Sequence, residues 1–290
     1  MQLTRQDKRQ QVKVKGMTEK FSAQLVYLVP VLASLLFGLA CAYLLVAQPL
    51  PPVEVTPFHE GTPSAPLGNA FYFVILIGLS ATIFYILLKR KSQKIIFALI
   101  AVALTTASLL LSIVYLSAVF AYAPDLDFLV LPLSILVTAI FDLAIFKLGN
   151  KPRNAAVVLL GGGLGVFFSA VIPFFSAVLI LVFLAVYDVF AVYYGPVGKI
   201  AHSGLDQLQG LSFSFKDVQM GLGDLVFYSM LTGSILLNYD SLLPYFASLI
   251  GILAGSFLTL IMLEKKGIFP GLPFPIILGL AGGILTSLII

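Results

Sequence analysis

The chain has 290 residues, of which 60% are hydrophobic and only 10% are charged, and its mean hydropathy is +1.06. A composition this apolar excludes a soluble globular domain, in which about 25% of the residues are charged. The net charge of +4 does not indicate nucleic-acid binding, because the basic residues fall in short clusters between apolar segments. We therefore expect an integral membrane protein whose main partner is the lipid bilayer.

Apolar segments long enough to cross a bilayer recur along the whole chain. A helix needs about 20 apolar residues to span the hydrocarbon core. We predict nine transmembrane helices at 23–47, 69–88, 95–121, 128–148, 155–172, 174–194, 218–239, 241–263 and 268–290. A turn around Pro173 separates the fifth from the sixth, and the pairs Gly161/Gly165 and Gly251/Gly255 indicate close helix packing. The fold class is an all-α polytopic membrane protein.

The positions of the basic residues predict how these helices are oriented. All 17 lysines and arginines fall on one side of the predicted helices, whereas the connections on the other side carry acidic residues and no basic one. The positive-inside rule then puts the N-terminus in the cytosol and the C-terminus outside. We expect a basic cytosolic tail (1–22), helices one to six (23–194), a cytosolic loop (195–217) and helices seven to nine (218–290), which together form one membrane domain.

Three acidic residues, Asp142, Asp188 and Asp224, fall inside predicted helices. A carboxylate at mid-bilayer costs about 2.5–3.5 kcal/mol on insertion scales, so each needs an explanation. An ion pair with Lys147 or a packing role explains Asp142. Asp188 and Asp224 each lie about six residues, or about 9 Å, from the cytosolic end of consecutive antiparallel helices. We therefore expect these two acids at the same depth in the membrane.

Two carboxyl groups at one level in a low dielectric share a proton, because both cannot ionise cheaply. One can then activate a water molecule while the other polarises a peptide carbonyl, which is the chemistry of aspartic proteases. Gly221 and Gly223 leave room for a substrate backbone beside Asp224. Taken alone, these features fit a proton relay in a transporter or channel equally well.

Three motifs resemble those of the presenilin and signal-peptide-peptidase family of intramembrane aspartyl proteases. They are Tyr187-Asp188 on predicted helix six, Gly221-Leu222-Gly223-Asp224 on helix seven, and Pro270-Gly271-Leu272-Pro273 on helix nine. The last of these resembles the family's Pro-Ala-Leu motif, with Gly271 in place of the usual alanine. The order of the motifs and the nine-helix topology extend the resemblance over nearly the whole chain.

The resemblance implies that Asp188 and Asp224 are the catalytic pair and that no metal or cofactor takes part. It assigns the substrate-binding positions to Tyr187, Gly221, Leu222, Gly223, Pro270, Gly271, Leu272 and Pro273. The substrates would be transmembrane proteins, cleaved within the bilayer. The inward direction of helix six favours the presenilin branch, and the loop 195–217 is too short to imply the self-cleavage of animal presenilins.

The short chain suggests a prokaryotic homologue in the cell membrane, working without accessory subunits and with a homo-oligomer left open. A substrate helix must unwind before it is cut, and its extended stretch then needs main-chain partners. We expect these partners in the polar segment before Gly221 and in the chain near Pro270. The rival interpretations are a proton-coupled transporter and, within proteases, a prepilin-peptidase type, which normally has fewer helices.

Overall fold

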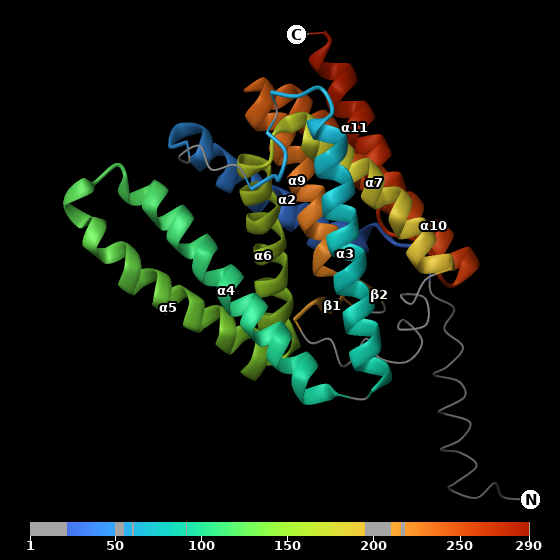
Figure 1. The fold of residues 1–290 in the computed structure, drawn as a ribbon, viewed down its shortest axis with the longest axis horizontal. Helices are drawn as coiled ribbons and strands as arrows, with labels where there is room; N and C mark the ends of the chain where they lie inside the picture. The colour runs from blue at the N-terminus through green and yellow to red at the C-terminus, as the bar shows by residue number, and fades with distance from the viewer. Residues whose placement is uncertain are drawn as a thin grey trace, which may run out of the picture.

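The computed structural model describes residues 22–49, 55–59, 61–90, 92–194, 210–215 and 218–289. Within these residues the nine predicted helices are present and in the predicted order (Figure 1). They are α2 (Val29–Ala47), α3 (Ala65–Lys89), α4 (Gln93–Phe120), α5 (Val130–Asp142), α6 (Asn150–Val171), α7 (Phe174–Tyr193), α9 (Leu222–Tyr239), α10 (Leu242–Lys266) and α11 (Pro273–Ser287). All but the last residue of the predicted tail 1–22, and most of the predicted loop 195–217, lie outside the described residues.

Short irregular helical turns extend two of these helices. Leu25–Leu28 form a 3-10 turn (η1) before α2, and Pro124–Leu129 form another (η2) before α5. A π-helical turn at Leu143–Lys147 (η3) continues α5. With these additions, seven helical segments in the described part of the chain are long and apolar enough to cross a membrane, and α9 and α11 fall short of that criterion.

The central position of α9 explains why it can carry several polar residues and falls short of the criterion for a membrane-spanning helix. Helices α2, α6, α7, α10 and α11 all pack against it (Figure 1). Its side chains Leu225, Leu231 and Ile235 are fully buried, and so is the hydroxyl-bearing Ser229. A helix enclosed by other helices does not have to face lipid, so its sequence can carry polar residues.

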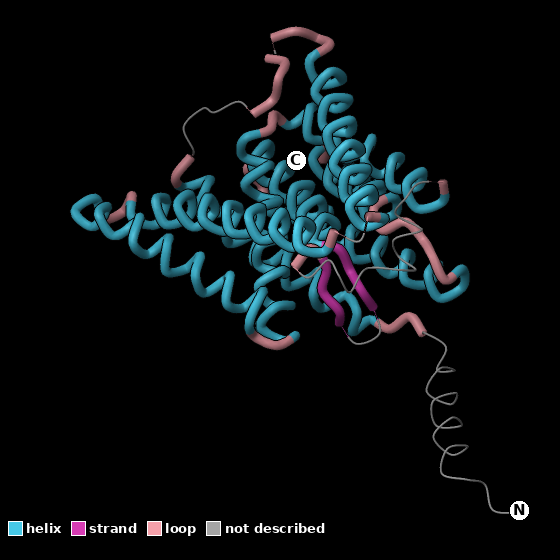
Figure 2. The backbone as a smooth tube through the Cα atoms, turned by 60° about the horizontal axis from the view of Figure 1, so that its bottom comes forward, coloured by secondary structure: helices cyan, strands magenta, loops and turns pink. Residues whose placement is uncertain are grey.

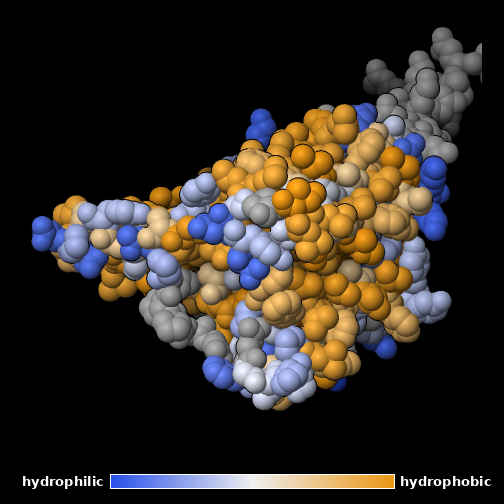
Figure 3. Space-filling model, turned by 90° about the horizontal axis from the view of Figure 1, so that it is seen from above, coloured by the Kyte–Doolittle hydropathy of each residue, from blue (hydrophilic) through white to orange (hydrophobic). Residues whose placement is uncertain are grey.

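The surface that these helices present is largely apolar. Hydrophobic residues cover most of the face drawn in Figure 3, and large side chains such as Leu79, Val102 and Phe175 are exposed. An exposed apolar surface of this extent is what a bilayer requires of a protein embedded in it. The chain is therefore a multi-pass integral membrane protein.

Glycines allow the helices next to α9 to approach closely, as the spacing predicts. A methyl group on Gly165 of α6 would lie 2.6 Å from Ser229 Cβ on α9, and it would also strike the Val226 carbonyl. A methyl group on Gly255 of α10 would lie 2.5 Å from the backbone of Phe274 on α11. These contacts fix the positions of α9, which carries Asp224, and of α11, which begins at the last residue of the Pro270–Pro273 motif.

A two-stranded hairpin stands where the first turn of helix seven was predicted. Strands β1 (Ser212–Phe215) and β2 (Val218–Gly221) pair antiparallel, and α9 begins only at Leu222 (Figure 2). The prediction of a helix from residue 218 is therefore wrong by one turn. Likewise α11 begins at Pro273 rather than at residue 268. Gly221 and Pro270 explain the two delays, because glycine and proline are poor residues for a helix interior.

Candidate active site

The two acids predicted to pair are brought together where α7 and α9 pack side by side. Asp188 lies near the C-terminal end of α7, and Asp224 lies in the first turn of α9. Both side chains are partly buried. The two acids thus lie on two contacting helices, and their common depth in the membrane stays a prediction.

A third segment, between α10 and α11, meets both acids. The main-chain N–H of Leu272 donates a hydrogen bond to Asp188 Oδ2, with an N···O distance of 3.0 Å. The Cα of the preceding Gly271 faces Asp224, because a methyl group built there would lie 3.0 Å from Asp224 Oδ2 and 3.3 Å from its Cγ. Two adjacent residues of one loop therefore contact the two carboxyl groups.

Tyr228 completes this arrangement and was not predicted from the sequence. Its hydroxyl donates a hydrogen bond of 2.8 Å to the carbonyl oxygen of Gly271. Its side chain is buried, with 2% of its surface exposed. Tyr228 follows Asp224 by four residues, a spacing that places both side chains on one face of a helix. This four-residue spacing from Asp224 is the one feature of the sequence that could have indicated Tyr228 as a residue of the site.

The predicted glycines beside Asp224 have different surroundings. Gly221 ends β2 and lies against the carboxyl group, since a methyl group there would be 3.8 Å from Asp224 Oδ2. Gly223 is exposed, and a methyl group there would meet only the Phe227 ring, at 3.8 Å. The backbone at Gly223 is therefore open to an approaching chain. The side chain of Leu222, by contrast, is buried against α6.

The remaining predicted positions frame the loop before α11. Pro270 is buried and Pro273 is the first residue of α11. The rings of Phe269 and Phe274 stack across these prolines, with centroids 5.4 Å apart. The Leu272 side chain is only 6% exposed and belongs to the hydrophobic core, so the main chain of this residue, rather than its side chain, reaches the acids.

The ring of Tyr187 lies against α3. A methyl group on Gly78 of α3 would lie 3.6 Å from the Tyr187 hydroxyl. The ring therefore borders the interface between α3 and α7, one residue from Asp188. Further along α7, Phe183 packs edge-on against Phe71 of α3, with ring centroids 5.2 Å apart. Both aromatic contacts place α3 beside α7.

The third intramembrane acid, Asp142, lies apart from the pair. It ends α5, which forms a hairpin with α4 at the edge of the molecule, away from α9 (Figure 1). The Thr105 hydroxyl lies 3.0 Å and 2.9 Å from its two carboxylate oxygens. Its partner in the structure is therefore this hydroxyl on α4, which fits the packing role rather than the predicted ion pair with Lys147.

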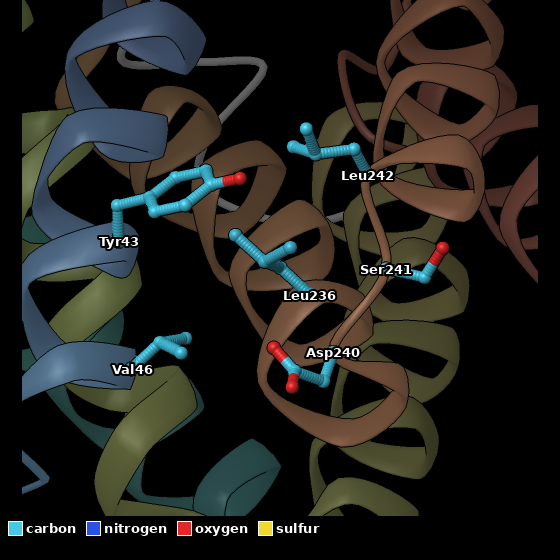
Figure 4. Close-up of a pocket in the computed structure, with 6 residues that line it drawn as sticks. All are labelled: Tyr43, Val46, Leu236, Asp240, Ser241 and Leu242. Carbon is cyan, nitrogen blue, oxygen red and sulfur yellow. The ribbon is translucent and has the colours of Figure 1, made fainter.

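A cavity of about 290 Å³ opens at the other end of α9. It is lined by Tyr43, Val46, Leu236, Asp240, Ser241 and Leu242 (Figure 4). Asp240 lies 16 residues after Asp224, which corresponds to about 24 Å along the helix. None of the residues predicted for the site lines this cavity.

Comparison with known proteins matches two consecutive parts of the chain to related sequence families. The model of the family described as "Signal-peptide peptidase, presenilin aspartyl protease" matches residues 32–202, and the model of the family described as "Presenilin" matches residues 201–290. Presenilin-B of Dictyostelium discoideum is 33% identical over 121 residues, which are 38% of this chain. The matched part is 25% of that relative, about a quarter of its length.

Two solved structures share the fold. Both are described as structures of a presenilin family intramembrane aspartate protease, one in the C222 and one in the P2 space group. The first superposes with a TM-score of 0.64 at 17% identity, covering 92% of this chain and 99% of the other. The second has a TM-score of 0.63 at 23% identity and covers 91% and 98% of the two chains. These similarities establish the arrangement of the helices.

Proposed function

Because the chain belongs to the family of signal-peptide peptidases and presenilin aspartyl proteases, we propose that it hydrolyses peptide bonds within the transmembrane segments of other membrane proteins. The observation that carries this proposal is the meeting of Asp188 and Asp224 at one loop segment, Gly271 to Leu272. The contacts of Asp142 with Thr105 on another helix pair argue against a relay through all three acids.

Asp188 and Asp224 act as one unit in the proposed reaction. In the resting pair one carboxyl group is charged and the other is protonated, since two negative charges beside one another are unfavourable in a low dielectric. The charged group takes a proton from water, and the protonated group donates a hydrogen bond to the peptide carbonyl that the water attacks. The proton taken from water later reaches the leaving amine.

The hairpin before α9 supports a role in binding the extended substrate. In the described chain, the outer side of β1 faces α6, and Asn154 Nδ2 donates a hydrogen bond of 2.7 Å to the Ser214 carbonyl. Because strand residues alternate in direction, the Ser214–Gln219 pair has its main-chain groups turned outwards. At Gln219 these groups face the open edge of β2, which leads directly to Asp224. An unwound substrate segment would pair along this edge.

The cellular setting forms part of the same proposal. The short connections between the helices suggest an enzyme that works without accessory subunits, as a single chain or a homo-oligomer, in a prokaryotic cell membrane. The N-terminus would be cytosolic and the C-terminus extracytoplasmic, as the clusters of basic residues predict.

Cleavage by the purified protein tests this function directly. The protein is incubated with a transmembrane peptide, and the fragments are read by mass spectrometry with and without an aspartyl-protease transition-state analogue. We expect fragments that arise from cuts inside the transmembrane segment and that disappear when the analogue is added. Intact peptide under both conditions, together with proton or ion flux in liposomes, would establish the transporter instead.

A further inference from the structure

The peptide group between Gly271 and Leu272 is held at both of its ends. Its carbonyl oxygen accepts a hydrogen bond of 2.8 Å from the Tyr228 hydroxyl, and its N–H donates one of 3.0 Å to Asp188 Oδ2. The carbonyl and the N–H belong to one planar unit. The two hydrogen bonds together therefore set the rotation of this peptide plane.

The surrounding chain contains no regular structure that would fix the plane by itself. Gly271 lies between the end of α10 and the start of α11, outside both helices. Glycine has the widest freedom of backbone rotation, so the Gly271–Leu272 peptide needs a partner to keep one orientation. Tyr228 supplies a rigid one, because its side chain is buried and it projects from the most enclosed helix.

The helix that carries Tyr228 also carries Asp224. The two residues lie four positions apart, so α9 presents a carboxyl group and a hydroxyl group to Gly271 from successive turns. The Tyr228 contact thus connects α9 to the peptide that donates to Asp188 on α7. One hydrogen-bonded path runs from the helix of one acid to the carboxylate of the other.

We propose that Tyr228 is a positioning residue for the protease reaction, an inference that rests on the proposed function. Its hydroxyl holds the Gly271–Leu272 peptide so that the Leu272 N–H is directed at Asp188 and the Gly271 Cα stays against Asp224. The Tyr228 side chain thereby sets the relative placement of the two carboxyl groups. It need not touch the substrate.

Removal of the hydroxyl alone is the appropriate test, and the chain offers two matched controls. Tyr245 and Tyr115 also donate their hydroxyls to backbone carbonyls, of Leu35 and Gly163, each at 2.7 Å. Tyr245 is fully buried and Tyr115 partly so. The variants Tyr228→Phe, Tyr245→Phe and Tyr115→Phe therefore each remove one hydroxyl that donates to a main-chain carbonyl. The control carbonyls of Leu35 and Gly163 lie inside α2 and α6, whereas that of Gly271 lies outside the helices.

Steady-state cleavage of one transmembrane peptide is measured for all three variants, together with their thermal unfolding in detergent. We expect similar losses of stability in the three. In Tyr228→Phe alone, kcat should fall about 10- to 100-fold, the size expected for a misplacement of less than 1 Å, with KM changed by less than about threefold. A kcat equal to that of the two controls, or a raised KM at unchanged kcat, would overturn the proposal.

A double-mutant cycle with Leu272→Pro, which removes the N–H at the other end of the peptide, gives the second measurement. If both residues act through one peptide plane, the double variant should lose less in kcat than the product of the two single losses. Fully multiplicative losses would contradict the shared path. Should Leu272→Pro fail to fold, the affinity of Tyr228→Phe for a transition-state analogue replaces the cycle, and an affinity like that of the controls overturns the proposal. An inactive wild-type protein would instead reject the proposed function.

Discussion

The main-chain N–H of Leu272 donates directly to Asp188, although 84 residues separate the two along the chain. The contact joins the start of α11 to the end of α7 that carries Asp188, so the placement of α11 sets the surroundings of this acid. It also explains how the Pro270–Pro273 motif can contribute to the site although none of its side chains is reactive. Its contribution to the site is a backbone donor.

The first prediction concerns the two acids. Asp188→Asn and Asp224→Asn should each abolish cleavage as completely as the double variant, because the groups share one function. The wild-type pH profile should be bell-shaped, since activity needs one charged and one neutral carboxyl group. The folded state should be unchanged or slightly more stable, because an unfavourable charge is removed. The activities are compared by cleavage of one transmembrane peptide at matched amounts of folded protein.

Asp142→Asn is the control for that series. Asp142 lies between α4 and α5 and accepts from Thr105, so we expect most of the activity to remain. Substantial cleavage by either variant of the pair would refute the dyad. A loss in Asp142→Asn equal to theirs would point to a relay through three acids.

The second prediction concerns the size of residue 271. A methyl group on Gly271 would lie 3.0 Å from Asp224 Oδ2, so the carboxyl group would have to move by a few tenths of an ångström. We expect Gly271→Ala to lower kcat about 3- to 10-fold and Gly271→Val to lower it by about 100-fold or more. Gly149→Ala is the control, because a methyl group there meets nothing within 4 Å. An increase in kcat for Gly271→Ala would contradict this expectation, because it would mean that displacement of the Asp224 carboxyl group improves its position for the reaction.

The third prediction concerns the packing of α6 against α9. Gly165→Val would force side-chain atoms into Ser229 and the Val226 carbonyl, and overpacking of this kind costs about 1–3 kcal/mol. We expect a lower free energy of unfolding, measured by titration with a denaturing detergent, and reduced cleavage by the protein that remains folded. An unchanged free energy of unfolding would mean that α6 and α9 can move apart to accommodate the valine at no cost in stability.

Much of this architecture was predictable from the sequence because lipid imposes a strong pattern. The nine helices and their order follow from runs of apolar residues. The hairpin was missed because tertiary contacts stabilise it: Val218 packs with Tyr27 and Leu260 in a small separate cluster. A four-residue strand next to a long apolar run carries too little signal of its own.

The role of Tyr228 was missed for a related reason. Its four-residue spacing from Asp224 was visible, but its hydrogen-bond partner, Gly271, comes from another part of the chain. The approach of Gly271 to Asp224 likewise depends on how α10 and α11 pack, through contacts such as that of Gly255 with Phe274. Sequence spacing describes one helix at a time, whereas the site is assembled from three segments.

The fourth prediction tests the orientation of the helices. A reporter fused after Ile290 should be extracytoplasmic, and one inserted near Ser203 should be cytosolic, because the basic clusters all fall on the side of the N-terminal tail. Protease protection in inverted and right-side-out vesicles measures both. Reporters found on the same side would contradict the nine-helix topology.

The last prediction concerns the open edge of β2. At Gln219 the main-chain N–H faces away from β1, so Gln219→Pro would remove a donor for the substrate and leave the hairpin's own hydrogen bonds in place. We expect KM to rise about tenfold, the equivalent of about 1.4 kcal/mol for one lost hydrogen bond, with kcat at saturation little changed. Gln219→Ala is the control, because it removes the side chain and keeps the N–H. Met220→Pro should be more damaging, since residue 220 faces β1 and its N–H belongs to the ladder. An unchanged KM in Gln219→Pro, measured with the same transmembrane peptide, would show that the substrate does not pair with β2.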